Sequence, residues 1–162
     1  MHTRDLRGLY INELQEARSF ERQIASAFGE LEERATDPDL RRVLTEEGPE
    51  ARGHAEALAE LLRGHGEEAD AHHDAALEAM LDEAHAWSGA IEDPAVRDAA
   101  LIASAQRVQH SEIAVFGSPA AWAGRLGLPD RERLEAILEA GKRADAKLTE
   151  LALRRVNAQA ED

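Results

Sequence analysis

The feature that most constrains the fold of this chain is a helical spacing of apolar residues that returns in several segments. In the first segment a stripe advances by 3, 4, 3, 4 and 3 residues, through Leu14, Ala17, Glu21, Ile24, Phe28 and Leu31. A later stripe advances by 4, 3, 4 and 3 residues, through Leu101, Ala105, Val108, Glu112 and Val115. This rhythm is typical of helices that pack side by side in a bundle. The sequence therefore predicts an all-α fold.

Two Asp-Pro pairs, at 37–38 and 93–94, each supply an N-cap and a proline at the first position of a helix. The first pair starts a helix that runs to about Leu62. Between the pairs, a polar connection from Glu67 to Asp93 carries a shorter helix, from Ala75 to about Trp87, and is long enough to cross the bundle. The last helix is expected from about Pro129 to Val156. We expect one domain, residues 1–162, with four core helices and the short helix outside them.

Prolines inside the helical pattern predict irregularities. Pro49 removes a backbone donor within the second helix, where we expect a kink. Gly117-Ser118-Pro119 predicts a break or bend in the helix that follows Asp93, with a restart over residues 120–126.

Composition narrows the class of partner and of chemistry. The chain has 162 residues, of which 43% are hydrophobic and 32% charged, and its net charge is -14. This charge repels phosphate backbones and anionic lipid, so neither nucleic acid nor membrane is an expected partner. We find no apolar run long enough to span a membrane and no signal peptide at Met1 to Asp5, so we expect a cytoplasmic location. Because there is no cysteine, metal chemistry would have to use oxygen and imidazole ligands.

Polar residues interrupt the apolar stripe of the second helix. At 100° per residue, Glu47 and His54 lie about 20° apart around the helix, and Glu50 lies about 60° to one side. All three point where the leucines of this helix point, into the core. Buried carboxylates and imidazoles are costly unless they are paired, protonated or bound to a cation. A metal ion would supply the reason for their position.

Register arithmetic brings further acidic residues to the same level. If the first two helices form a hairpin, residue n faces roughly residue 71 minus n, so Glu21 is level with Glu50. The same rule places Glu112 level with Arg143, between Gly141 and Asp145. We therefore predict a metal site made of Glu21, Glu50, His54 and Glu112, with Asp145 as a fifth candidate. Oxygen-rich sites with one imidazole suit iron or manganese.

Several segments resemble the YciE/YciF-type stress proteins, and the likeness covers nearly the whole chain. They are Phe20 to Ile24, Glu50 to His54, Asp98 to Ala103, Ala105 to Ile113, Lys147 to Ala152, and Val156-Asn157. The resemblance implies a ferritin-like four-helix bundle with a long crossover, a homodimer, an association with stress and a di-metal centre. This chain has Gln109 where the family usually has Glu, and Ala140-Gly141 where it has a Glu pair. Because these losses remove negative charge, we expect one ion rather than two.

Other interpretations of the same residues stay open. A stripe Glu can reach solvent or an arginine, and Glu47 could satisfy the backbone freed at Pro49 or pair with Arg52. His110 points away from Glu112. A solvated crossover accounts for the histidines of that region, which are His65, His72, His73 and His85. Trp87 and Trp122 suit a core or an interface.

Two functions from different classes follow from these readings. In the first, the bundle holds iron or manganese that reacts with O2 or peroxide. In the second, it is a metal-free helical module that dimerises and acts through its surface under stress. No catalytic residue is predicted in either case, and the sequence does not decide whether the chain is an enzyme.

Overall fold

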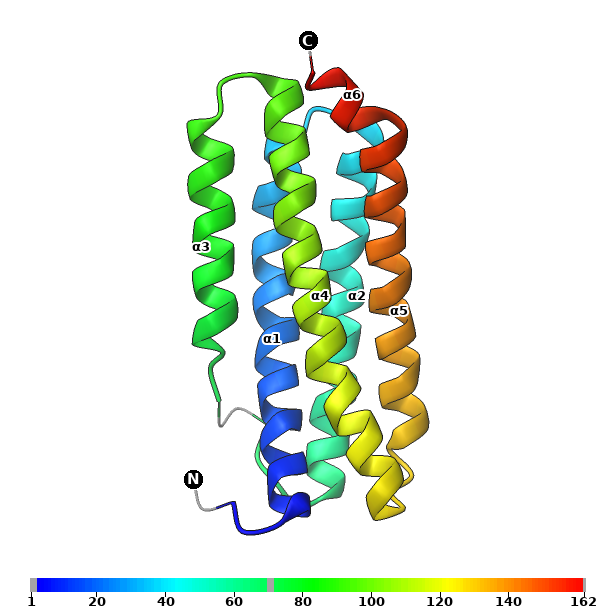
Figure 1. Ribbon diagram of the computed structural model, residues 1–162. Coiled ribbons are helices and arrows are strands. Elements are labelled where there is room, and N and C mark those ends of the chain that lie inside the picture. The colour runs from blue at the N-terminus through cyan, green and yellow to red at the C-terminus, as the bar shows by residue number, and fades with distance from the viewer. Residues whose placement is uncertain (1–2, 70–71, 162) are drawn as a thin grey trace.

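The computed structural model describes residues 3–69 and 72–161 of the chain. Its helices are α1 (Leu6–Arg34), α2 (Pro38–Gly64), α3 (Ala75–Ala90), α4 (Pro94–Leu126) and α5 (Arg131–Leu151), followed by a π-helical turn (Ala152–Val156) and the short α6 (Asn157–Gln159). The predicted all-α fold is confirmed: α1, α2, α4 and α5 form a ferritin-like four-helix bundle (Figure 1). Residues 1–2, on which the expectation about a signal peptide falls, and residues 70–71 of the predicted crossover lie outside the described residues.

The direction of the helices explains the long crossover. In Figure 1, α1 and α2 form an antiparallel pair, and α4 and α5 form a second one, while α2 and α4 run the same way. The chain must therefore return along the whole bundle between α2 and α4. Helix α3 makes this return, packed outside against α1 and α4, as the sequence predicts.

The predicted helix starts are confirmed in detail. The Asp37 carboxylate accepts hydrogen bonds from the backbone N–H groups of Asp39 and Leu40, and Asp93 makes the equivalent pair at the start of α4. Gly127 ends α4 in the left-handed region, with φ of 65°, which a residue with a side chain rarely adopts.

Of the break or bend predicted at residues 117–119, the break is wrong, because α4 continues without interruption from Pro94 to Leu126. A bend there stays a prediction. Phe116, Pro119, Ala120 and Ala123 are all buried in this stretch. A proline inside a helix costs about 3 kcal/mol, and burial of these neighbours against the bundle offsets that cost. Helix α2 likewise continues through Pro49.

The last regular α-helix ends at Leu151, earlier than the predicted end at Val156. Helix α5 stops at Leu151, and residues 152–156 follow as a π-helical turn that buries Ala152 and Val156. The wider turn rotates the apolar side chains by part of a turn, so both residues reach the core. Trp122, which the sequence suits to a core or an interface, is partly buried against the core.

The core consists of two apolar clusters. One lies towards the α1–α2 turn and includes Phe20, Ile24, Phe28, Leu44 and Leu148. The other lies towards the opposite end and includes Tyr10, Leu14, Leu58, Phe116 and Ile137. Near the boundary between the two clusters lie Glu21 of α1, His54 of α2 and Glu112 of α4. A polar layer therefore crosses the middle of the bundle.

No helix in the part of the chain that the structure describes is both long and apolar enough to cross a membrane.

Candidate metal centre

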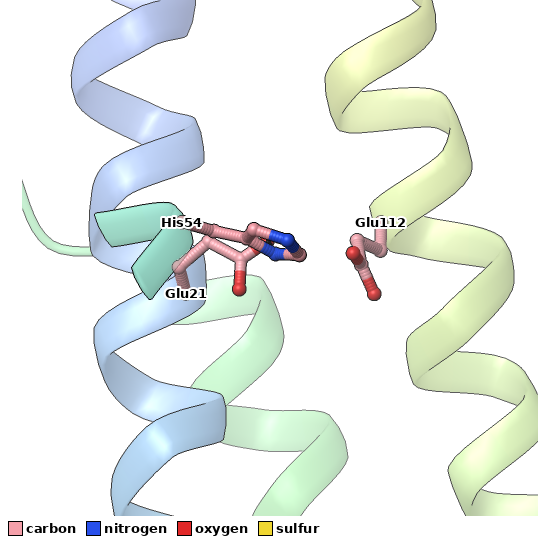
Figure 2. A group of neighbouring side chains, drawn as sticks. All are labelled: Glu21, His54 and Glu112. Atoms are coloured by element: carbon pink, nitrogen blue, oxygen red, sulfur yellow. Dashed lines mark ion pairs between the residues drawn. The ribbon is translucent and has the colours of Figure 1, made fainter. Parts of the chain in front are cut away.

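The polar layer brings together three ligand-type side chains from three helices. Glu21 comes from α1, His54 from α2 and Glu112 from α4, and Figure 2 shows them pointing toward one another across the bundle. One potential ligand atom from each lies within 4.8 Å of the other two. Within residues 3–69 and 72–161, this is the one group of three such side chains that meets that distance.

The group is buried, and its polar atoms are incompletely satisfied. Glu21 is 1% exposed and Glu112 4%, whereas the His54 side chain is 21% exposed. His54 Nδ1 lies 3.5 Å from Glu21 Oε1. That oxygen is buried and, within the described part of the chain, has no hydrogen-bond partner. An unpaired carboxylate oxygen in a core is costly, so this atom is placed where a cation or a proton belongs.

Burial and mutual repulsion make these carboxyls hold their protons. Burial, followed by the charge of Glu47, raises the pKa of Glu21 well above its usual value. Burial, followed by the charges of Glu21 and Glu47, raises the pKa of Glu112 to about 9. A divalent cation would displace these protons and relieve the repulsion.

Glu47 belongs to this layer, although the predicted ligand set omits it. Its side chain is buried and accepts a hydrogen bond of 2.9 Å from Gln109 Nε2. Burial raises the pKa of Glu47 to about 7, and the Gln109 hydrogen bond opposes that shift. The signal was present in the sequence, because Glu47 and His54 lie about 20° apart on the helix. Gln109 lies three residues before Glu112 and therefore on the same face of α4.

Glu50 lies at the edge of the group and not at its centre. It is exposed, yet it lines the same small cavity as Glu21, His54 and Glu112. Its charge contributes to the raised pKa of Glu21. The predicted level match between Glu21 and Glu50 therefore agrees with the structure, while Glu50 itself faces the opening of the cavity.

Gly141 faces Glu112 from α5, at the level that register arithmetic predicts. A Cβ atom built at Gly141 would lie 3.2 Å from Glu112 Oε1 and 3.3 Å from its Cδ. The missing side chain makes room for the carboxylate. The cavity beside this carboxylate has a volume of about 10 Å³ for the centre of a water molecule. That is roughly the room that one water molecule needs.

The structure does not bring Asp145 into the group. Its carboxylate lies 3.4 Å from His110 Nε2 and 3.4 Å from Gln106 Nε2, on the α4–α5 side of the bundle. Asp145 does not line the cavity at Glu21. Four residues separate it from Gly141, which turns it about 40° around α5 from the direction of Gly141.

The remaining histidines lie in other pairs. His65 Nε2 lies 2.6 Å from Asp130 Oδ2, where Tyr10 also donates a hydrogen bond. On the crossover side, His72 pairs with Glu16, His73 with Glu78 and His85 with Glu30. Each of these histidines has a carboxylate partner away from the cavity. The solvated crossover expected from the sequence suits His73, which is 61% exposed, but not His65, whose side chain is 11% exposed beside the buried Asp130.

Comparison with known proteins gives consistent matches. The family model described as a domain of unknown function, DUF892, matches residues 5–161. Protein YciF of Escherichia coli strain K12 is 31% identical over 164 residues, covering 100% of this chain and 99% of the relative. The crystal structure of that stress protein matches with a TM-score of 0.89 at 30% identity, over 96% of this chain and 99% of the other. YcfI from Rhodopseudomonas palustris matches with a TM-score of 0.86 at 33% identity, over 90% and 94% of the two chains.

Proposed function

The chain belongs to the DUF892 family, and from this and the polar layer of its bundle we propose that it is a stress-associated protein that binds one iron or manganese ion. The ligands are Glu21, His54 and Glu112, with Glu50 at the mouth of the cavity. The association with stress is supported by the similarity to the E. coli stress protein YciF.

The observation that carries the metal proposal is the position of Glu21 Oε1 beside His54 and Glu112. This buried oxygen has no hydrogen-bond partner among the described residues. The three ligand atoms lie within 4.8 Å of one another. Adjacent ligand atoms about 2.1 Å from one ion lie about 3.0–3.4 Å apart in octahedral or tetrahedral coordination, so the side chains would have to move toward one another by on the order of 1 Å when an ion binds. Rotations of the three side chains would supply this approach.

The donor set favours iron or manganese. Two carboxylates supply hard oxygen atoms and partly neutralise a divalent charge, and His54 adds one imidazole nitrogen. Ions that require thiolate ligands are disfavoured, because the chain has no cysteine. These ligands resemble the carboxylate and histidine positions of helical bundles that hold metals in their core.

A single ion fits the cavity better than two. The free space of about 10 Å³ has room for about one atom of the size of water. Glu47, the next carboxylate along α2, already accepts a hydrogen bond from the Gln109 amide. A second divalent ion would need that carboxylate and further negative charge, which Gln109 and Gly141 do not supply.

A bound iron or manganese ion would supply reactivity toward O2 or peroxide. The chain's own contribution is to hold Glu21 and Glu112 in a buried layer, to orient His54 beside Glu21 and to keep bulk water out. The apolar clusters on both sides of the layer hold these side chains in place.

Self-association into a homodimer and a cytoplasmic location are parts of the same proposal, supported by the family relationship. Trp122 is partly buried and α4 is continuous through Pro119, so neither feature adds support for a dimer. Light scattering at micromolar concentration is expected to give twice the monomer mass of 17.7 kDa. A monomer mass would remove the dimer from the proposal.

Metal analysis of protein purified without an affinity tag tests the central claim. We expect iron or manganese at one ion per chain, and calorimetry under anaerobic conditions should give the same stoichiometry with Fe(II) or Mn(II). The variant His54→Ala should lose this binding and keep its helical circular dichroism. Wild-type protein that binds neither ion would favour the metal-free helical module instead.

A further inference from the structure

The residues of the metal centre are buried on α1 and α4 and more exposed on α2. Glu21 of α1 and Glu112 of α4 are 1% and 4% exposed. The His54 side chain of α2 is 21% exposed, and Glu50, also of α2, is exposed. The cavity is completed by Ala140, Gly141 and Ala144 of α5. Its buried wall is therefore formed by α1 and α4, and its accessible side lies at α2 and α5.

Two exposed ion pairs indicate the register between α2 and α5. Lys147 Nζ lies 3.1 Å from Glu46 Oε2, and Arg133 Nη1 lies 2.8 Å from Glu60 Oε2. In both pairs the two residue numbers add up to 193, as expected for antiparallel helices in one register. The two pairs lie about 21 Å apart along α2, at 1.5 Å per residue.

The stretch between the two ion pairs is lined by small residues. On α2 the stripe between Glu46 and Glu60 passes through Glu50, Gly53 and Ala57. By the same register Gly53 lies level with Ala140 and Ala57 level with Ala136. A Cβ atom built at Gly53 would meet nothing within 4 Å. We call this stretch, formed by Glu50, Gly53, Ala57, Ala136 and Ala140, the α2–α5 seam.

We propose that the α2–α5 seam is the entrance through which a divalent cation reaches the buried metal centre, with Glu50 as the carboxylate that attracts the ion at its mouth. The inference rests on the proposed function, since it presumes that the centre takes up an ion. At the inner end of this path lies Glu21 Oε1, a buried oxygen without a hydrogen-bond partner among the described residues. Two exposed ion pairs between the helices, Glu46–Lys147 and Glu60–Arg133, flank the opening on either side.

The rate of metal uptake tests the path. Metal-free protein is mixed with Co(II), whose visible absorption changes on ligation, in a stopped-flow instrument. A side chain at Gly53 narrows the seam without touching any ligand, so Gly53→Leu should slow uptake at least tenfold, while stoichiometry stays the same and Kd stays within about twofold. Gly53→Ala, which favours the helix and is safe for folding, should slow it by a smaller factor. The control is Gly29→Leu on α1, where an added Cβ also meets nothing within 4 Å.

The charge at the mouth is tested separately. Glu50→Gln should lower the uptake rate severalfold and weaken its dependence on ionic strength, because electrostatic attraction acts on the rate of encounter. The matched control is Glu56→Gln, an exposed carboxylate of the same helix that lines the groove between α1 and α2.

The outcomes separate the two proposals. Unchanged uptake in Gly53→Leu, or equal effects of Glu50→Gln and Glu56→Gln, would place the entrance elsewhere and leave the metal centre standing. Wild-type protein that never binds Co(II), Fe(II) or Mn(II) would overturn the proposed function and the entrance together.

Discussion

Gly141 of α5 lies directly against the carboxylate of Glu112 on α4, so close that an added Cβ would be 3.2 Å from Oε1. A glycine inside a helix costs about 0.5–1 kcal/mol relative to alanine. The buried carboxylate occupies the space that this substitution leaves. A glycine that is unfavourable for the helix α5 therefore makes room for a carboxylate of the polar layer.

This contact predicts the effect of Gly141→Ala. The new methyl group should displace the Glu112 carboxylate and lower metal affinity about tenfold, as changes next to a ligand commonly do. Calorimetric titration with Mn(II) measures the affinity. Gly29→Ala is the matched control, because its Cβ meets nothing within 4 Å and should only stabilise the fold, by about 0.5–1 kcal/mol. Equal metal affinity in both variants would contradict the proposed role of Gly141.

Glu21→Gln should separate metal binding from folding. The amide keeps the shape of the side chain but cannot ionise to become an anionic ligand, so we expect metal affinity to fall at least about a hundredfold. At pH 8 the metal-free variant should be more stable than wild type by about 1–3 kcal/mol, because folding no longer has to protonate and bury a carboxylate that is ionised in the unfolded chain. Urea unfolding measures the stability. Glu33→Gln, at an exposed position of the same helix, should change neither quantity.

The stability of the metal-free protein should fall as the pH rises. Burial is the main cause that raises the pKa of Glu47 to about 7 and that of Glu112 to about 9, from an ordinary value of 4.5. Above pH 4.5 the unfolded chain loses these protons while the folded chain keeps them, so unfolding becomes more favourable until the folded groups ionise as well. Glu47 alone should lower the free energy of unfolding by on the order of 3 kcal/mol between pH 5 and pH 8.

Urea unfolding in the presence of a chelator, at pH 5 and pH 8, checks this dependence. Glu47→Gln should flatten the profile, because its side chain no longer titrates. A wild-type protein that is equally stable at both pH values would show that the layer is not buried as described.

Asp98 should matter for stability and not for metal binding. Its carboxylate accepts hydrogen bonds from Thr36 N, Thr36 Oγ1 and Asp37 N at 2.6–2.8 Å, and so ties the α1–α2 turn to α4. Asp98→Ala leaves these donors without their partner and should destabilise the protein by about 2–3 kcal/mol. Thermal unfolding measures the loss. The stoichiometry of Mn(II) binding at 20 °C or below, roughly the range of maximum stability, should stay at the wild-type value.

Local spacing was sufficient to predict the helices and the level of the polar layer. The repeat of apolar residues along Leu14 to Leu31 and Leu101 to Val115 follows from the helical period, and the Asp-Pro starts follow from capping. Equal rise per residue then places Glu21 level with Glu50, about one helical turn from His54, and separately places Glu112 level with the stretch of α5 between Gly141 and Asp145. These relations hold within a helix or across a short turn, where sequence distance determines spatial distance.

Only the tertiary structure decided which carboxylates of that layer lie inside. Glu47 and Glu50 point in directions that differ by about 60° around the axis of α2. The packing of α2 against α1 and α5 turns Glu47 inward and Glu50 toward the seam. The same kind of rotation keeps Gly141 at the cavity and Asp145 beside His110. The sequence determines the angles between residues of one helix, whereas the rotation of each helix about its own axis is set by the packing of all its neighbours. For the same reason burial keeps α4 continuous through Pro119, against its local preference.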